Sequence, residues 1–137
     1  MTQDDVFIAP LKKLAKASKA QLGGVACFVL KNGAIISSGL NHNPTGEPME
    51  MLVDGKLVSR PEVVHAEVAA IQAAAANGVD LADTTLLLTM SPCIKCAQQI
   101  VKTDIARVHY LYEWWDKAGL DILRAGGVKV KKVRQEK

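Results

Sequence analysis

Three candidate metal ligands lie in two short segments that are far apart along the chain. One segment is His65-Ala66-Glu67, and the other is Pro92-Cys93-Ile94-Lys95-Cys96. A structural zinc site normally has four protein ligands, whereas one histidine and two cysteines leave a coordination position open for water. The fold must therefore bring both segments to one point, where the Glu67 carboxylate is a candidate proton carrier. We interpret the pattern as a hydrolytic zinc centre, in preference to a structural zinc or an accidental Cys-x-x-Cys pair.

The two cysteines have a spacing and a context that suit a metal. Cys93 and Cys96 are three positions apart, so they share one face of a helix. Ser91-Pro92 before them predicts an N-cap followed by proline in the first helical position. A helix N-terminus lowers the pKa of a thiol and favours the thiolate that zinc binds.

His65 and Glu67 place a condition on the helix that carries them. Residues two apart point to nearly opposite sides of a helix, so these side chains can reach one metal only from the helix end. The sequence permits a helix start at Pro61 or near Val64. The later start puts the metal off the helix N-terminus within reach of both side chains, and we therefore expect it.

Apolar patterns and turn signals predict an α/β fold. A helical period over residues 4–20 precedes apolar runs at 24–30 and 34–38, and Asn32-Gly33 between these runs favours a hairpin. Residues 41–64 predict a long loop with a small hairpin around Asp54-Gly55. Helices and strands then alternate, which implies parallel strands joined by right-handed crossovers. The expected helices are 65–76, 91–103 and 116–125, and the expected strands are 84–89, 107–112 and 128–133.

Length and composition indicate one ordinary globular domain. The chain has 137 residues, of which 49% are hydrophobic and 23% charged. We expect a single domain over residues 1–137, folded as a three-layer α/β/α sandwich with a central mixed sheet of about five strands. No run approaches the roughly 20 apolar residues of a membrane span, and the acidic start is unlike a secretion signal. We therefore expect a cytoplasmic protein with no membrane partner.

Cysteine and charge usage narrow the range of partners. Cys27 lies inside the apolar run 25–30, which predicts a buried thiol rather than a functional one. The net charge is only +3, and a solvated tail explains the cationic C-terminal segment better than nucleic-acid binding does. That segment carries Lys129, Lys131, Lys132, Arg134 and Lys137. We expect no nucleic-acid partner.

At the candidate zinc ligands the sequence resembles the zinc-dependent cytidine deaminase superfamily, which has a His-x-Glu and Pro-Cys-x-x-Cys signature. Within that superfamily it is most similar to the deoxycytidylate deaminases, over roughly residues 24–130. The segment 39–46, Gly-Leu-Asn-His-Asn-Pro-Thr-Gly, looks like a loop of that family, and residues 119–128 look like its closing helix and strand. Two positions depart from the family pattern: Leu40 replaces a tyrosine and Ala69 replaces an asparagine.

The resemblance implies roles for individual residues. His65, Cys93 and Cys96 would hold one Zn²⁺ per chain, and Glu67 would shuttle protons. Asn41 would touch a sugar, while the Ala66 amide and the Ser91 carbonyl would address a base. Trp115, in the pair Trp114-Trp115, would lie near the pocket, although core packing at a strand end is an equal alternative. Residues 43–64 contain no cysteine or histidine, so we expect no second zinc there.

The function implied by the resemblance is deamination of a free deoxycytidine nucleotide, dCMP to dUMP plus ammonia. Alternatives that keep the chemistry are deamination of deoxycytidine, dCTP, guanine or tRNA adenosine. A non-catalytic nucleotide-binding protein that contains zinc belongs to a different class, and the presence of Glu67 disfavours it. The resemblance also implies a homo-oligomer and a small-molecule nucleotide substrate.

Overall fold

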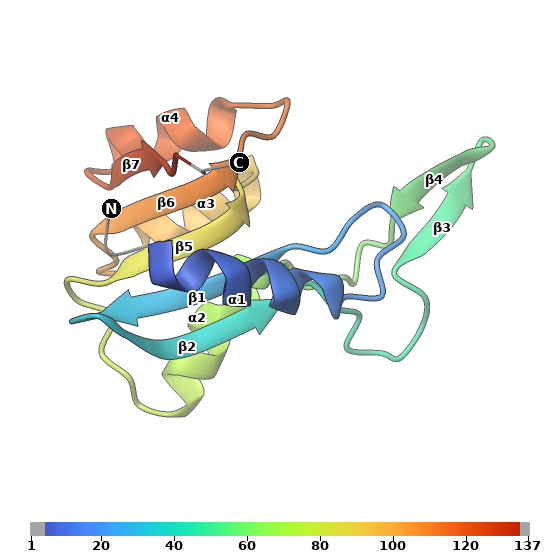
Figure 1. The fold of residues 1–137 in the computed structure, drawn as a ribbon. Helices are drawn as coiled ribbons and strands as arrows, with labels where there is room; N and C mark the ends of the chain where they lie inside the picture. The colour runs from blue at the N-terminus through green and yellow to red at the C-terminus, as the bar shows by residue number, and fades with distance from the viewer. Residues whose placement is uncertain (1–4, 135–137) are drawn as a thin grey trace.

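A five-stranded mixed sheet forms the middle layer of the structure, a computed structural model that describes residues 5–134 (Figure 1). β1 runs antiparallel to both β2 and β5, whereas β5, β6 and β7 are parallel. This parallel half confirms the prediction from alternating helices and strands. In spatial order the strands are β2 (Ala34–Leu40), β1 (Ala26–Lys31), β5 (Thr85–Met90), β6 (Arg107–Tyr112) and β7 (Lys129–Lys132).

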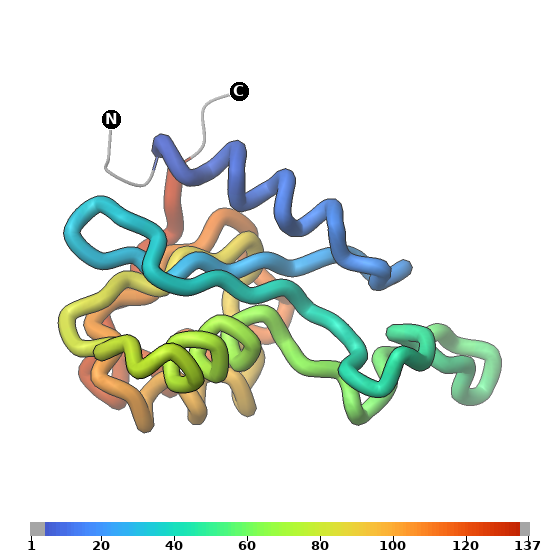
Figure 2. The backbone as a smooth tube through the Cα atoms, turned by 90° about the horizontal axis from the view of Figure 1, so that it is seen from below, coloured from blue at the N-terminus to red at the C-terminus, as the bar shows by residue number. Residues whose placement is uncertain are grey.

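Helices cover both faces of this sheet, as Figure 2 shows from the side. Leu11 packs with Phe28 and Leu87 on the first face, and the alanines of the second helix pack with Leu86 and Leu88 on the other. The predicted α/β/α sandwich is confirmed. Within residues 5–134, no helix has the length and apolar character needed to cross a membrane. The first face carries α1 (Asp5–Lys16), and the second carries α2 (Ala66–Ala76), α3 (Ile94–Val101) and α4 (Ala118–Ala125).

Both predicted hairpins form, and each has the turn chemistry that the sequence indicates. Asn32 and Gly33 have φ values of 52° and 77°, and Asp54 and Gly55 have 51° and 76°. Two successive residues with positive φ make the type I′ turn that matches the twist of paired strands. The second hairpin joins β3 (Glu50–Val53) to β4 (Lys56–Ser59) and projects away from the central sheet (Figure 1).

The start of α3 differs from the prediction. Ser91-Pro92 predicts the N-cap, but Cys93 is the N-cap residue and the helix begins at Ile94, so that prediction is wrong. The Ser91 N–H donates to the Tyr112 carbonyl at 2.9 Å, which extends the pairing of β5 with β6. The Ser91 hydroxyl accepts a hydrogen bond from the Trp114 N–H at 2.7 Å. Ser91 therefore continues the sheet instead of starting the helix.

The first helix ends earlier than predicted. Its period suggests a helix to residue 20, but α1 ends at Lys16. Ser18 then accepts a hydrogen bond from the Ala20 N–H and donates one to the Asn41 carbonyl. These local and long-range bonds draw the chain out of the helix and toward the end of β2.

Two glycines allow very close packing beside the metal-ligand segments. A Cβ atom on Gly39 in β2 would collide with the Ala66 carbonyl and with the Ala70 backbone nitrogen. A Cβ atom on Gly119 in α4 would collide with the carbonyl of Pro92, just before α3. Each glycine therefore holds the backbone of one ligand segment against a neighbouring element.

We expect Gly39→Ala and Gly119→Ala each to lower the free energy of unfolding by about 1–3 kcal/mol, because overpacking at a backbone contact forces the chain to shift. Urea denaturation measures this change. Ser38→Ala is the matched control, since Ser38 is the exposed neighbour of Gly39 on β2. The control should change the free energy by less than about 0.5 kcal/mol. Wild-type stability in both glycine variants would contradict the close packing.

Candidate metal centre

α2 begins late enough for His65 and Glu67 to face one point. His65 is the N-cap residue with an extended backbone (φ −75°, ψ 156°), and the helix starts at Ala66. Val64 pairs with His42 through backbone hydrogen bonds of 3.0 and 2.8 Å, which keeps the chain extended up to the cap. His65 therefore projects from outside the helix and Glu67 from its first turn. The later of the two permitted starts is confirmed.

Cys93 and Cys96 occupy comparable positions at the start of α3. Cys93 is the N-cap residue (φ −74°, ψ 173°), and Cys96 is in the first turn. Because Cys93 is not helical, the two sulfurs converge from the helix end rather than along one helical face. Neither N-cap makes a side-chain cap hydrogen bond. The first N–H groups of both helices have no partner within the helix and carry partial positive charge, which favours anionic sulfur nearby.

The three candidate ligand atoms have the spacing that zinc requires. Nδ1 of His65 lies 3.1 Å from Sγ of Cys96 and 3.7 Å from Sγ of Cys93. All three atoms lie within 4.8 Å of one another. Zinc bonds of about 2.0 Å to nitrogen and 2.3 Å to sulfur, at tetrahedral angles, place nitrogen and sulfur about 3.5 Å apart. The donor set therefore fits zinc, with a fourth position for a non-protein ligand.

The two sulfurs differ in their affinity for a proton. A hydrogen bond from the Cys96 thiol, together with His65, lowers the pKa of Cys93 to about 4. The same bond to Cys93, together with burial, raises the pKa of Cys96. The hydrogen bond with Cys93 also raises the pKa of His65, against the effect of burial. Zinc binds the deprotonated groups, so it must displace protons held by Cys96 and His65.

Glu67 is a buried carboxyl beside these ligands. It is only 4% exposed, and burial raises the pKa of its carboxyl group, while the His65 charge opposes the rise. None of the ion pairs within residues 5–134 involves Glu67. A carboxyl with a pKa nearer neutrality can both accept and release protons under physiological conditions. Its position suits proton transfer better than structural charge pairing.

Ala66 and Ser91 flank the ligands as the sequence predicts. Ala66 is the first residue of α2, so its N–H has no acceptor within the helix. Ser91 lies between the end of β5 and Cys93, and both residues are buried. The structure thus brings both next to the metal ligands, while their contact with a base stays a prediction.

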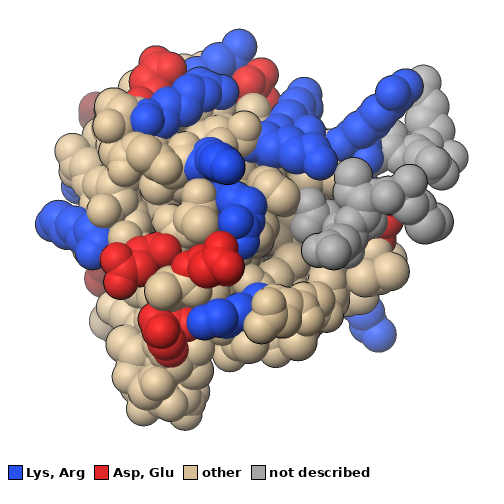
Figure 3. Space-filling view, turned by 90° about the vertical axis from the view of Figure 1, so that its left-hand side faces the viewer, with Lys and Arg blue, Asp and Glu red and all other residues tan. Residues whose placement is uncertain are grey.

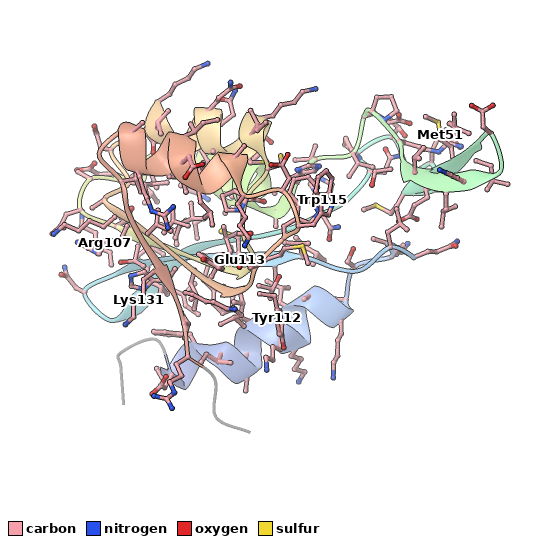
Figure 4. The ribbon with its side chains drawn as sticks, turned by 90° about the horizontal axis from the view of Figure 1, so that it is seen from above. Met51, Arg107, Tyr112, Glu113, Trp115 and Lys131 are labelled. Atoms are coloured by element: carbon pink, nitrogen blue, oxygen red, sulfur yellow. The ribbon has the colours of Figure 1, made fainter. Side chains whose placement is uncertain are left out.

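Asn41 and Trp115 have different surroundings. The Asn41 side chain accepts a hydrogen bond from the Val25 N–H at 2.9 Å and donates one to the Gly23 carbonyl at 3.4 Å, so it closes the loop before β1. Trp115 is 80% exposed, which rules out core packing for this ring (Figure 4). Its ring centroid lies 5.0 Å from that of Trp114, whose N–H binds Ser91. Sugar contact by Asn41 and pocket contact by Trp115 stay predictions.

One buried carboxylate that supports the Asn41 loop was not predicted from the sequence. Glu50 is 7% exposed, and its side chain accepts a hydrogen bond from the Leu22 N–H at 3.2 Å. It therefore fixes the same loop that Asn41 binds at Gly23 and Val25. No periodic pattern surrounds Glu50 in the segment 41–64, so nothing in the sequence distinguishes it from a surface acid.

Comparisons with known proteins agree with this geometry. Residues 1–112 match the model of the cytidine and deoxycytidylate deaminase zinc-binding region. Deoxycytidylate deaminase of Enterobacteria phage T2 is 27% identical over 85% of this chain and 85% of its own. A probable deoxycytidylate deaminase of Drosophila melanogaster is 33% identical, over 94% and 71%. The crystal structure of dCMP deaminase from cyanophage S-TIM5, in complex with dCMP and dUMP, superposes with a TM-score of 0.86 at 28% identity, covering 95% of this chain and 96% of the other.

We expect zinc affinity to fall as the pH falls from about 7.5 to about 6, by about tenfold per pH unit for each displaced proton. The sign follows from the raised pKa values of Cys96 and His65, because protons compete better with the metal as the pH falls. Competition with a chromophoric chelator measures the affinity, and metal analysis should find one zinc per chain.

Cys27→Ala is the matched control, because burial raises the pKa of this thiol and it lies outside the ligand group. It should keep the wild-type zinc affinity at both pH values. An affinity that does not change with pH, or two zinc ions per chain, would contradict the assigned ligand set.

Proposed function

Because the chain belongs to the family of cytidine and deoxycytidylate deaminases, we propose that it hydrolyses dCMP to dUMP and ammonia. The observation that carries the proposal is the convergence of His65, Cys93 and Cys96 beside a buried carboxyl. The similarity to the S-TIM5 enzyme, whose structure holds dCMP and dUMP, supports a deoxycytidine nucleotide as substrate. The protein is a hydrolytic deaminase, and Zn²⁺ is its cofactor.

In the proposed site, His65, Cys93 and Cys96 hold the metal through one nitrogen and two sulfurs. Zinc held there would act as a Lewis acid and lower the pKa of a coordinated water to about 7. The two helix N-termini add positive partial charge on the protein side of the site. Burial of Cys96, at 3% exposed, keeps bulk water away from that side.

Glu67 moves the protons of the proposed reaction. Its carboxylate takes one proton from the attacking water and delivers it to N3 of the cytosine ring. It then takes the second proton from the hydroxyl group now on C4 and transfers it to the departing amino group. The C4–N bond breaks and a C4–O bond forms, so the products are a uracil nucleotide and ammonia. The raised pKa of this carboxyl suits a group that must act as base and then as acid.

The segments around the ligands recognise the rest of the proposed substrate. The Ala66 N–H at the start of α2 and the Ser91 carbonyl after β5 address the base, from positions next to the metal ligands. Asn41 binds the sugar, which requires its side chain to add to or exchange the bonds with Gly23 and Val25. Exposed Trp115 covers the substrate from the solvent side.

Three broader proposals accompany this activity. Residues 1–137 form one deaminase domain, and its partner is a free nucleotide rather than a nucleic acid. The protein acts in the cytoplasm, which the free thiols Cys27, Cys93 and Cys96 support, because a reducing compartment keeps cysteines unpaired. The small net charge of +3 supports a small-molecule substrate.

The protein is also a homo-oligomer in this proposal, and the β3–β4 hairpin contributes to the contact between copies. Leu52 is 73% exposed and Val53 44% exposed on this projection, and Met51 lies on it as well (Figure 4). An isolated two-stranded hairpin is marginally stable in water, and exposed apolar groups mark interaction surfaces. A second copy of the chain would bury these side chains.

We expect ammonia release to be fastest with dCMP in a panel that also contains dCTP, deoxycytidine, cytosine, guanine and tRNA. Glu67→Gln should lower kcat by about 10²–10⁴-fold, because it removes the proton carrier, and should leave zinc bound. Glu47→Gln is the matched control at an exposed loop position and should keep wild-type activity. Absence of ammonia from dCMP would contradict the proposed substrate, and full activity of Glu67→Gln would contradict the proton carrier.

We expect light scattering after size exclusion to give a mass of two or more chains, where one chain is 14.7 kDa. Leu52→Lys should shift the population toward monomer, because it places a charge in the apolar contact. Ile35→Lys is the control, since Ile35 is an apolar residue on β2 that is 43% exposed and lies outside the β3–β4 hairpin. A monomeric wild type, or equal dissociation by both variants, would contradict a hairpin-mediated assembly.

A further inference from the structure

A cavity lies at the opposite end of the sheet from the metal centre. Its volume is about 490 Å³, and it is bordered by the last residues of β1 and the first residues of β5 and β6. The metal centre lies beyond the other end of β5. The six residues of β6 separate the two ends by roughly 17 Å. Figure 4 shows Arg107 and Lys131 at the cavity end and Trp115 at the other.

The cavity exists because α1 covers only part of its face of the sheet. Leu87 and Leu111 pack in the core under α1. Alternate residues of a strand share a face, so Thr85 of β5 and Arg107 of β6 lie on this same face, past the end of the apolar cluster. Both residues line the cavity. The uncovered part of the face is thus polar and cationic, whereas the covered part is apolar.

Arg107 is held in a fixed orientation at the cavity. Its Nε donates to the Thr85 hydroxyl at 2.8 Å, and both terminal nitrogens donate to Asp83 Oδ1 at 3.2 Å. A further bond joins Nη2 to the Asp83 carbonyl at 3.0 Å. The Asp83 side chain is 81% exposed, so the ion pair contributes little stability. Its main effect is to orient the guanidinium.

Two lysines add positive charge beside this fixed group. Lys31 at the end of β1 and Lys131 on β7 line the same cavity, together with Arg107 and His109. Asp83 is the only carboxylate among the described lining residues, and it is bound to Arg107. Figure 3, which views the molecule from this end, shows Lys and Arg side chains gathered on the surface beside a smaller acidic group.

We propose that this cavity binds a small organic molecule that carries two or more phosphate groups. The four hydrogen bonds to Thr85 and Asp83 leave one of the five N–H groups of Arg107 for a phosphate oxygen, and the lysines add point charges on either side. The volume falls in the range of small-molecule sites and exceeds what an inorganic phosphate fills. Phe7 and Leu30 offer an apolar wall for the organic part. The proposal does not depend on the deaminase activity, because the site lies at the other end of the sheet.

Isothermal titration of the full chain with fructose 1,6-bisphosphate tests the proposal. Binding should saturate at one site per chain, and uncharged fructose should not bind. Lys131→Gln and Lys31→Gln should each raise Kd by about tenfold, because each removes one charge-assisted contact. dCMP should not displace the probe.

Lys132→Gln is the matched control. Lys132 is the exposed neighbour of Lys131 on β7 and points to the other face of the strand. Its substitution removes the same charge as Lys131→Gln does. It should change Kd by less than about twofold. No binding by the wild type, an equal loss in Lys132→Gln, or displacement of the probe by dCMP would each overturn the proposal.

Discussion

The site depends on one constraint, which is that the N-termini of α2 and α3 meet at the carboxyl end of the central strand β5. A histidine and a carboxylate two positions apart can serve one metal only if their helix begins between them, and α2 does begin there, at Ala66. The cysteines meet the same requirement, with Cys93 just outside α3 and Cys96 within its first turn. Gly39 and Gly119 then hold the two ligand segments against β2 and α4.

The electrostatics of the site follow from this arrangement. Burial of a carboxylate is unfavourable for folding, because its charge loses hydration. Glu67 bears this cost beside groups that zinc binds, and the raised pKa of its carboxyl is the visible result. Helix N-termini oppose the cost on the protein side. The unfavourable burial of the Glu67 charge therefore lies at the candidate metal centre.

Local patterns predicted most of the fold because turns and amphipathic periods are local properties. Asn32-Gly33 and Asp54-Gly55 predicted hairpins correctly, because these residue types tolerate the positive φ values that a type I′ turn requires. Ser91-Pro92 misled because pairing of β5 with β6 continues through Ser91, and a long-range hydrogen bond overrides a local cap signal.

Within the candidate site, the metal ligands and Glu67 were predictable from chemistry and spacing. The bonds of Asn41 to Gly23 and Val25, and the support from Glu50, were not, because they join segments with no common local pattern. The cavity at the other end of the sheet was equally hidden. Lys31, Arg107 and Lys131 come from three different strands, and the sequence alone suggested a solvated tail for the last of them.

The separation of the ligands along the chain has a consequence for folding. His65 and the cysteines are 28 and 31 positions apart, and the intervening segment contains α2 and β5. A metal bound to all three residues crosslinks the two ends of this segment and lowers the conformational entropy of the unfolded chain. Because β5 is the central strand of the sheet, this crosslink connects the starts of α2 and α3, the helices before and after the central strand. The ion that supports the chemistry therefore also stabilises the folded state.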